Sequence, residues 1–151
     1  MHDLSKIQLK HILPHAAPMI LIDAVKDYAS DYIHTTLLVR NDAPFCSGGR
    51  VPAYVAIEYM AQSIAAWHSL NSEQNYMHAK IGFLLGSRNM QLETDFFYVG
   101  DQLDISCNAV FSHEGMAAFD CYLEHNGARM VQATLNVFQP EDVTQFLEVP
   151  A

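Results

Sequence analysis

One carboxylate stands out in the sequence because it interrupts a long apolar run. Glu58 lies between Ile57 and Tyr59, with no basic residue within a helical turn of it. Burial of an unpaired carboxylate raises its pKa, and a carboxyl group with a raised pKa can act as a general acid or base near neutral pH. Gln62 lies four residues further on the same helical face and could hydrogen-bond the carboxylate or a substrate water. We therefore predict that Glu58 and Gln62 are catalytic; the alternative is that Glu58 faces solvent or caps another backbone segment.

Backbone groups at the start of the same run form a second set of candidates. Ala53, Tyr54 and Val55 follow a loop, so their N–H groups would have no intrahelical partner and could polarise a carbonyl oxygen. Gly86, like Gly82, lies in a predicted strand, where a missing side chain permits close approach of a ligand or a backbone. We predict that Ala53, Tyr54, Val55 and Gly86 bind substrate, although every helix start offers such amides.

The eight histidines and three cysteines show no metal-ligand or nucleophile spacing. Pro14 separates His11 from His15 and breaks their helical face, and His68 lies about 15 Å along an ideal helix from the candidate carboxylate. Cys46 has no histidine neighbour in the sequence and is interpreted as a small apolar filler. Phosphate-loop and dinucleotide motifs are absent, so we expect neither a metal nor a cofactor.

The pattern of apolar residues predicts the elements that position these candidates. Pro52–Leu70 is apolar on all sides and contains no glycine and no further proline, which indicates a buried helix. Strict alternation predicts antiparallel strands covered on one side, and Asn126-Gly127 marks a hairpin between two of them. The predicted strands are 19–25, 33–39, 80–90, 103–111, 119–124 and 131–137, with a short helix over 4–13, a turn around 28–31 and a loop over 43–52. The fold class is therefore α+β, with one sheet curled around one helix.

Composition limits the classes of function. The chain has 151 residues, enough for one domain, and it carries a formal net charge of −9, which argues against general binding of nucleic acid or anionic membranes. Apolar runs are far shorter than the ~20 residues of a membrane span, and the N-terminus does not resemble a signal peptide. An odd number of cysteines favours a reducing compartment, so we expect a cytoplasmic protein.

Several segments resemble the hotdog-fold 3-hydroxyacyl-ACP dehydratases of the FabA/FabZ type. The resemblance lies in residues 12–15 (I-L-P-H), 18–23 (P-M-I-L-I-D), 52–62 (P-A-Y-V-A-I-E-Y-M-A-Q) and 100–103 (G-D-Q-L). Residues 51–62 together with 82–88 (G-F-L-L-G-S-R) are closer still to the ApeP-like branch associated with aryl polyene biosynthesis. The resemblance implies a single hotdog domain over 1–151 and sites formed between two paired subunits.

The departures from the FabA/FabZ pattern concern the catalytic base. Those dehydratases carry a histidine in an H-F-P-G segment before the helix, whereas Phe45–Val51 of this chain has none. Ala53 replaces the helix-start glycine, and Ala16, which follows His15 of the I-L-P-H segment, replaces the arginine of the family pattern. The resemblance therefore assigns catalytic roles only to Glu58 and Gln62. It implies that a histidine-bearing hotdog partner completes the site, because the ApeP-like branch is thought to work with a second hotdog dehydratase.

Three functions are compatible with these residues. The first is dehydration of 3-hydroxyacyl thioesters on an acyl carrier protein, as a homodimer or as a heterodimer with another hotdog dehydratase. The second is a hotdog acyl thioesterase, in which a helix carboxylate activates water and no histidine is needed. The third is a non-catalytic subunit that binds acyl chains or stabilises a partner. The product separates the first two, and the effect of Glu58→Gln on the assembled complex separates the third.

Overall fold

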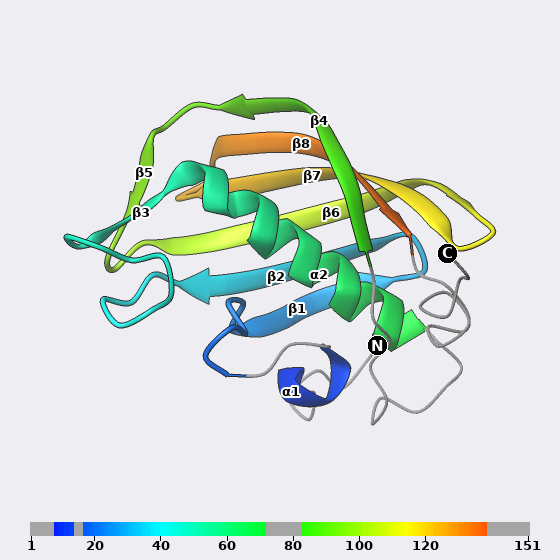
Figure 1. The fold of residues 1–151 in the computed structure, drawn as a ribbon, viewed down its shortest axis with the longest axis horizontal. Helices are drawn as coiled ribbons and strands as arrows, with labels where there is room; N and C mark the ends of the chain where they lie inside the picture. Colours follow the sequence, from blue (N-terminus) through cyan, green and yellow to red (C-terminus); the bar gives the residue numbers. More distant parts are fainter. Residues whose placement is uncertain (1–7, 14–16, 72–82, 139–151) are drawn as a thin grey trace, which may run out of the picture.

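The computed structural model describes residues 8–13, 17–71 and 83–138. In chain order the elements are α1 (Leu9–Ile12), β1 (Ala24–Ala29), β2 (Tyr32–Leu38), β3 (Arg50–Pro52), the 3₁₀ turn η2 (Ala53–Val55), α2 (Ala56–Asn71), β4 (Phe83–Leu92), β5 (Phe96–Tyr98), β6 (Gln102–His113), β7 (Met116–His125) and β8 (Ala128–Phe138). Six strands form an antiparallel sheet in the order β1-β2-β6-β7-β8-β4, and β3 pairs with β5 beside the start of α2 (Figure 1). The fold is α+β, as predicted.

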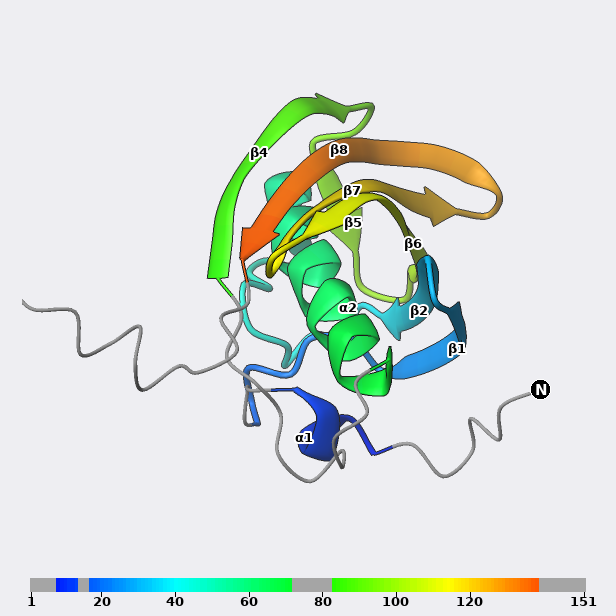
Figure 2. The ribbon, with the colours of Figure 1, turned by 90° about the vertical axis from the view of Figure 1, so that its right-hand side faces the viewer.

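The sheet curves around α2, and this wrapping creates the core (Figure 2). Alternate residues of the three long strands β6, β7 and β8 point inward, because successive side chains of a strand face opposite sides of the sheet. The buried inward residues are Leu103, Ile105, Cys107, Phe119, Cys121, Leu123, Val131, Ala133 and Leu135. The three predicted alternating strands are therefore confirmed, and each extends a little beyond its predicted ends.

Helix α2 packs its buried side against the inner face of the sheet. Met60 and Ile64 are buried, and the Trp67 ring meets Phe119 edge to face at 5.0 Å between centroids. The Thr35 and Ser63 hydroxyls hydrogen-bond each other at 2.7 Å, so a polar pair between β2 and α2 is satisfied within the core. The predicted helix is confirmed, although its first turn is a 3₁₀ turn over Ala53–Val55.

The predicted hairpin after β7 is also confirmed. Asn126 and Gly127 have φ values of 52° and 78°, and they join β7 to β8. Both central residues of a type I′ turn need positive φ, and asparagine and glycine tolerate that conformation best.

Three predicted boundaries were wrong. Met19–Ile22 is not a strand, since β1 begins only at Ala24. The helix predicted over 4–13 is a single turn from Leu9 to Ile12, with 4–7 outside the described residues. The loop predicted over 43–52 contains the short strand β3, whose pairing with the distant β5 leaves no local sequence signal. The predicted strand 80–90 corresponds to β4, with 80–82, and thus Gly82, outside the described residues.

Within the residues that the structure describes, every helix falls short of the length and apolarity needed to cross a membrane.

Candidate active site

Glu58 lies in the first turn of α2, and its side chain is exposed. The prediction that Glu58 is buried was therefore wrong for the isolated chain. Within the described residues, no hydrogen bond or ion pair reaches its carboxylate. The alternative that this residue faces outward is the one that the structure supports for a single subunit.

The physical reason is that the sheet covers only part of the helix circumference. An exposed or half-buried stripe runs along the other side of the helix at intervals of three and four residues, the spacing of one helical face. We call this the open stripe; it consists of Tyr54, Ile57, Glu58, Ala61, Ala65 and His68. Because the open stripe contains alanine and isoleucine beside Glu58, another surface could cover it and bury the carboxylate.

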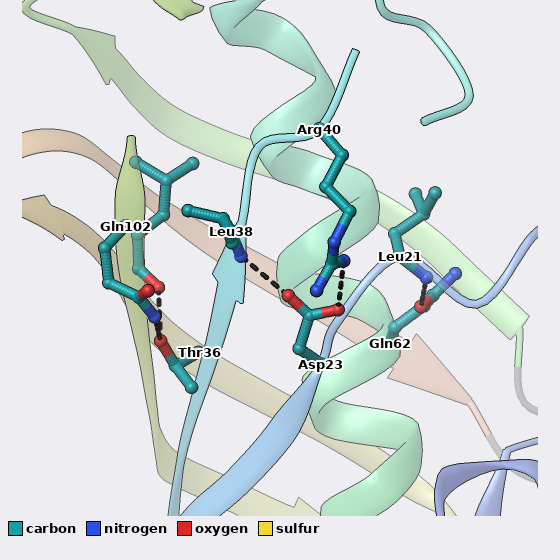
Figure 3. Close-up of polar contacts among 8 residues, drawn as sticks. Leu21, Asp23, Thr36, Leu38, Arg40, Gln62 and Gln102 are labelled. Atoms are coloured by element: carbon teal, nitrogen blue, oxygen red, sulfur yellow. Dashed lines mark hydrogen bonds and ion pairs between the residues drawn. The ribbon is translucent and has the colours of Figure 1, made fainter. Parts of the chain in front are cut away.

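Gln62 makes backbone contacts that the sequence did not indicate, and its catalytic role stays a prediction. Its side chain is buried, and its Oε1 accepts the Leu21 N–H at 2.8 Å (Figure 3). Its Nε2 donates to the Met19 carbonyl at 2.6 Å. Both ends of the amide are engaged by the backbone that precedes β1. Gln62 therefore holds this segment against α2 like a clamp formed by two hydrogen bonds. It would have to break at least one of these hydrogen bonds to orient a substrate hydroxyl.

Asp23 holds the other end of the same segment (Figure 3). Its Oδ2 accepts the Leu38 N–H at 2.7 Å, and its Oδ1 accepts a hydrogen bond from the Arg40 guanidinium at 2.8 Å. With Gln62 at one end and Asp23 at the other, residues 19–23 lie along α2 and β2 without being part of the sheet. This explains why an apolar run that resembles a strand is not one.

The predicted amides at the helix start are only partly available. The Ala53 N–H donates to the Asp95 carbonyl at 2.9 Å, so the segment before β5 supplies an acceptor for this amide. Substrate binding by Ala53 stays a prediction. For Tyr54, whose side chain is exposed, and for Val55, which is buried, substrate binding stays a prediction.

Gly86 lies in β4, the last strand of the sheet order, opposite Asn136 of β8. A Cβ atom at this position would meet nothing within 4 Å. The glycine therefore leaves open space beside the strand, and its role in binding substrate stays a prediction.

Sequence reasoning missed the environment of Arg50. This exposed residue begins β3, and its guanidinium carbon lies 3.8 Å from the centroid of the Phe96 ring on β5. Strands β3 and β5 lie beside the start of α2 (Figure 1). The segments here also carry exposed aromatic side chains: Phe45 in the loop before β3, Tyr54 in η2 and Tyr98 in β5. The available signal was a lone arginine after Gly48-Gly49, close in sequence to the candidate carboxylate.

Within the described ranges, the thiols and histidines do not gather into a site. Cys46 is half-buried against the core, as predicted for a filler, and Cys107 and Cys121 are buried cross-strand neighbours. Burial raises the pKa of the Cys107 thiol well above its usual value, which opposes a nucleophilic role. Among the residues described, no three histidine, cysteine or acidic side chains gather in a way that could hold a metal ion.

An antiparallel sheet wrapped around a long helix, with a carboxylate near the helix start, defines a hotdog-fold protein with a site on the helix. The chain belongs to the ApeP-like family, described as ApeP dehydratase, whose pattern matches residues 7–148. Membership of this family makes it a dehydratase or a dehydratase subunit, and dehydratases are lyases.

Solved structures agree with this assignment. A chain of "The Dehydratase Heterocomplex ApeI:P from Xenorhabdus doucetiae" is 29% identical, has a TM-score of 0.85, and matches over 94% of this chain and 98% of that chain. The smu.793 protein from Streptococcus mutans bound to acetyl CoA is 15% identical, with a TM-score of 0.60 and coverage of 91% and 96%. A hypothetical thioesterase with coenzyme A from Streptococcus pneumoniae is 16% identical, with a TM-score of 0.57 and coverage of 76% and 83%. The last two likenesses show the fold alone. No curated protein matches the chain in sequence.

Proposed function

We propose that this chain supplies the carboxylic acid for dehydration of a 3-hydroxyacyl thioester on an acyl carrier protein, and that a histidine-bearing hotdog partner supplies the base. A single domain over residues 1–151 would carry out this role. The observation that carries the proposal is the position of Glu58: it lies unpaired on the open stripe of α2, where a second subunit would cover it. The solved relative that is 29% identical forms a heterocomplex, which supports such a pairing.

Covering the open stripe would give Glu58 the property that the reaction needs. Removal of the carboxylate from water would disfavour its charged form and favour the neutral acid. The partner's imidazole would remove a proton from C2, and Glu58 would give its proton to the C3 hydroxyl as the C–O bond breaks and water leaves. The N–H groups of Tyr54 and Val55 would stabilise the negative charge that develops on the thioester oxygen. The proton taken by the imidazole then returns to Glu58, which restores the site.

The unpaired thiols of the chain fit a reducing compartment, which supports a cytoplasmic location for this reaction.

A single-turnover mass assay tests the proposal. The chain is mixed with a 3-hydroxyacyl carrier protein, alone and together with a histidine-bearing hotdog dehydratase, and the mass of the acyl group is followed. We expect loss of one water only with the partner, and a fall in rate of about 10²- to 10⁴-fold for Glu58→Gln. Glu114→Gln is the matched control, because Glu114 is an exposed glutamate in the turn between β6 and β7.

Three other outcomes would change the conclusion. Water loss by the chain alone would contradict the need for a partner. Release of free acid would indicate the thioesterase. An assembled complex that is equally active with Glu58→Gln would make this chain a non-catalytic subunit that binds acyl chains or stabilises its partner.

A further inference from the structure

Arg50 is fixed by a tight turn immediately before the helix. The Ser47 N–H donates to the Arg50 carbonyl at 2.9 Å, and the Arg50 N–H donates back to Ser47 at 3.4 Å. The two residues between them, Gly48 and Gly49, have φ values of 64° and 78°. Glycine adopts such values without strain, so the turn is favourable and the backbone of Arg50 has a defined direction.

The side chain of Arg50 is also held in place. Arg50 pairs with Tyr98 across β3 and β5, and its guanidinium lies over the Phe96 ring at 3.8 Å. This cation–π contact restricts the side chain. Within the described residues the guanidinium N–H groups donate no hydrogen bond, so they can bind an anion.

The charge of Arg50 is not neutralised within the described residues. Arg40, by contrast, forms an ion pair with Asp23 at 2.8 Å. Among the described residues no ion pair reaches Arg50, and the Asp101 carboxylate accepts the Tyr98 N–H at 2.9 Å. An arginine that is held in place without a counter-ion, eight positions before Glu58 in a chain of net charge −9, is a candidate site for an external anion.

The position of Arg50 relative to Glu58 suggests which anion this is. Seven residues lie between them, two in β3, three in η2 and two in α2, so their Cα atoms are at most roughly 18 Å apart. An extended pantetheine arm has a comparable length, with a thioester at one end and a phosphate ester at the other. Arg50 could therefore hold the phosphate while the thioester lies beside Glu58.

Resting on the proposed function, we infer that Arg50 binds the phosphate of the phosphopantetheine arm that carries the substrate. This phosphate occurs in acyl carrier protein and in coenzyme A, and bidentate hydrogen bonding by a guanidinium matches either one. Arg50 would be a residue that determines specificity for phosphorylated carriers and leaves the bond-breaking step to other groups.

Kinetics with three forms of one acyl thioester test this role. The acyl group is presented on carrier protein, on coenzyme A and on pantetheine without phosphate, with the chain assembled with its dehydratase partner. For the wild-type complex, we expect the KM of each phosphorylated thioester to be roughly tenfold lower than that of the pantetheine thioester, since a hydrogen bond to a charged group contributes a factor of this order. Arg50→Ala should abolish this preference, and the conservative Arg50→Lys should restore part of it.

Arg129→Ala is a matched control. The Arg129 guanidinium lies 3.8 Å from the centroid of the Tyr122 ring, so it has the same stacking but lies at the other hairpin, between β7 and β8. It should keep the full preference for phosphorylated substrates. If Arg50→Ala lost the preference for only one phosphorylated thioester, that of coenzyme A or that of carrier protein, this carrier would be the one that the site binds.

A binding measurement separates failure of this inference from failure of the proposed function. Calorimetric titration of the full chain with 4′-phosphopantetheine and with pantetheine requires no turnover. Tighter binding of the phosphorylated compound by wild type, lost in Arg50→Ala and kept in Arg129→Ala, would support the site even if no dehydration were seen. Equal binding of both compounds by wild type, or an unchanged preference in Arg50→Ala with its fold intact by circular dichroism, would overturn it.

Discussion

Gln62 shows how a residue of a catalytic motif can serve mainly the structure. The two hydrogen bonds of its buried amide join α2 to the backbone at Met19 and Leu21. Gln62→Met keeps the size of the side chain but leaves the buried N–H of Leu21 without an acceptor. We expect a loss of about 1–3 kcal/mol in the free energy of unfolding, measured by urea denaturation.

Gln91→Met provides the comparison for Gln62, because Gln91 is exposed on β4 and its side chain makes no hydrogen bond within the described residues. The control should change the free energy of unfolding by less than about 0.5 kcal/mol. If Gln62→Met were as stable as wild type while dehydration were lost, the amide would act on substrate and the clamp would be secondary.

Tyr59 predicts a dependence of stability on alkaline pH. Burial, with a smaller contribution from the Cys46 thiol, raises the pKa of Tyr59 to about 12 from its usual 10.0. Between these values the folded chain holds a proton that the unfolded chain loses, so the stabilisation is complete below pH 10 and falls as pH rises towards 12. Urea unfolding at several pH values should therefore show a steeper alkaline loss for wild type than for Tyr59→Phe, by up to about 1.4 kcal/mol per pH unit. Parallel slopes would contradict this.

Sequence reasoning singled out Glu58 as a candidate acid, but it was wrong about the surroundings of this residue. Apolar neighbours in sequence indicated burial, yet helical neighbours three and four residues away, such as Tyr54 and Ala61, decide which side of the helix a residue occupies. The partner of the Ala53 N–H could not be predicted either, because Asp95 lies far along the chain. Contacts of this kind depend on tertiary structure, which local patterns do not encode.

At the scale of the elements, strands with one buried face were the most predictable. Residues 103–107 and 131–135 alternate between buried and half-buried, whereas a bulge between Ala109 and Phe111 leaves the predicted inward residue Phe111 exposed. Asn126-Gly127 fixes the turn by its backbone preferences alone. Met19–Ile22 has the composition of a strand, but side-chain hydrogen bonds from Gln62 replace the ladder. Strand β3 has three residues and exists only because β5 pairs with it.

The open stripe of α2 predicts an effect on association. Ala61→Arg places a long charged side chain in the middle of the stripe, where a partner subunit would otherwise pack, and should weaken the complex with a hotdog partner by at least tenfold. Native mass spectrometry of a dilution series measures this. The change should leave the fold of the single chain intact, since Ala61 is only half-buried there.

Ala128→Arg is the corresponding control for association. Ala128 is exposed at the start of β8, next to the hairpin and away from α2. Equal weakening by both substitutions would point to a general charge effect, and no weakening by Ala61→Arg would place the partner on another surface.

For the whole molecule, the edge strand β4 predicts a tendency to aggregate. In the described part of the chain, β4 pairs with β8 on one side only, and Leu84 and Leu92 on this strand are exposed. An unpaired strand with apolar side chains is a template for aggregation. Expression of this chain alone should therefore give more insoluble protein than a variant with Leu84→Lys and Leu92→Lys, which places charges on this edge.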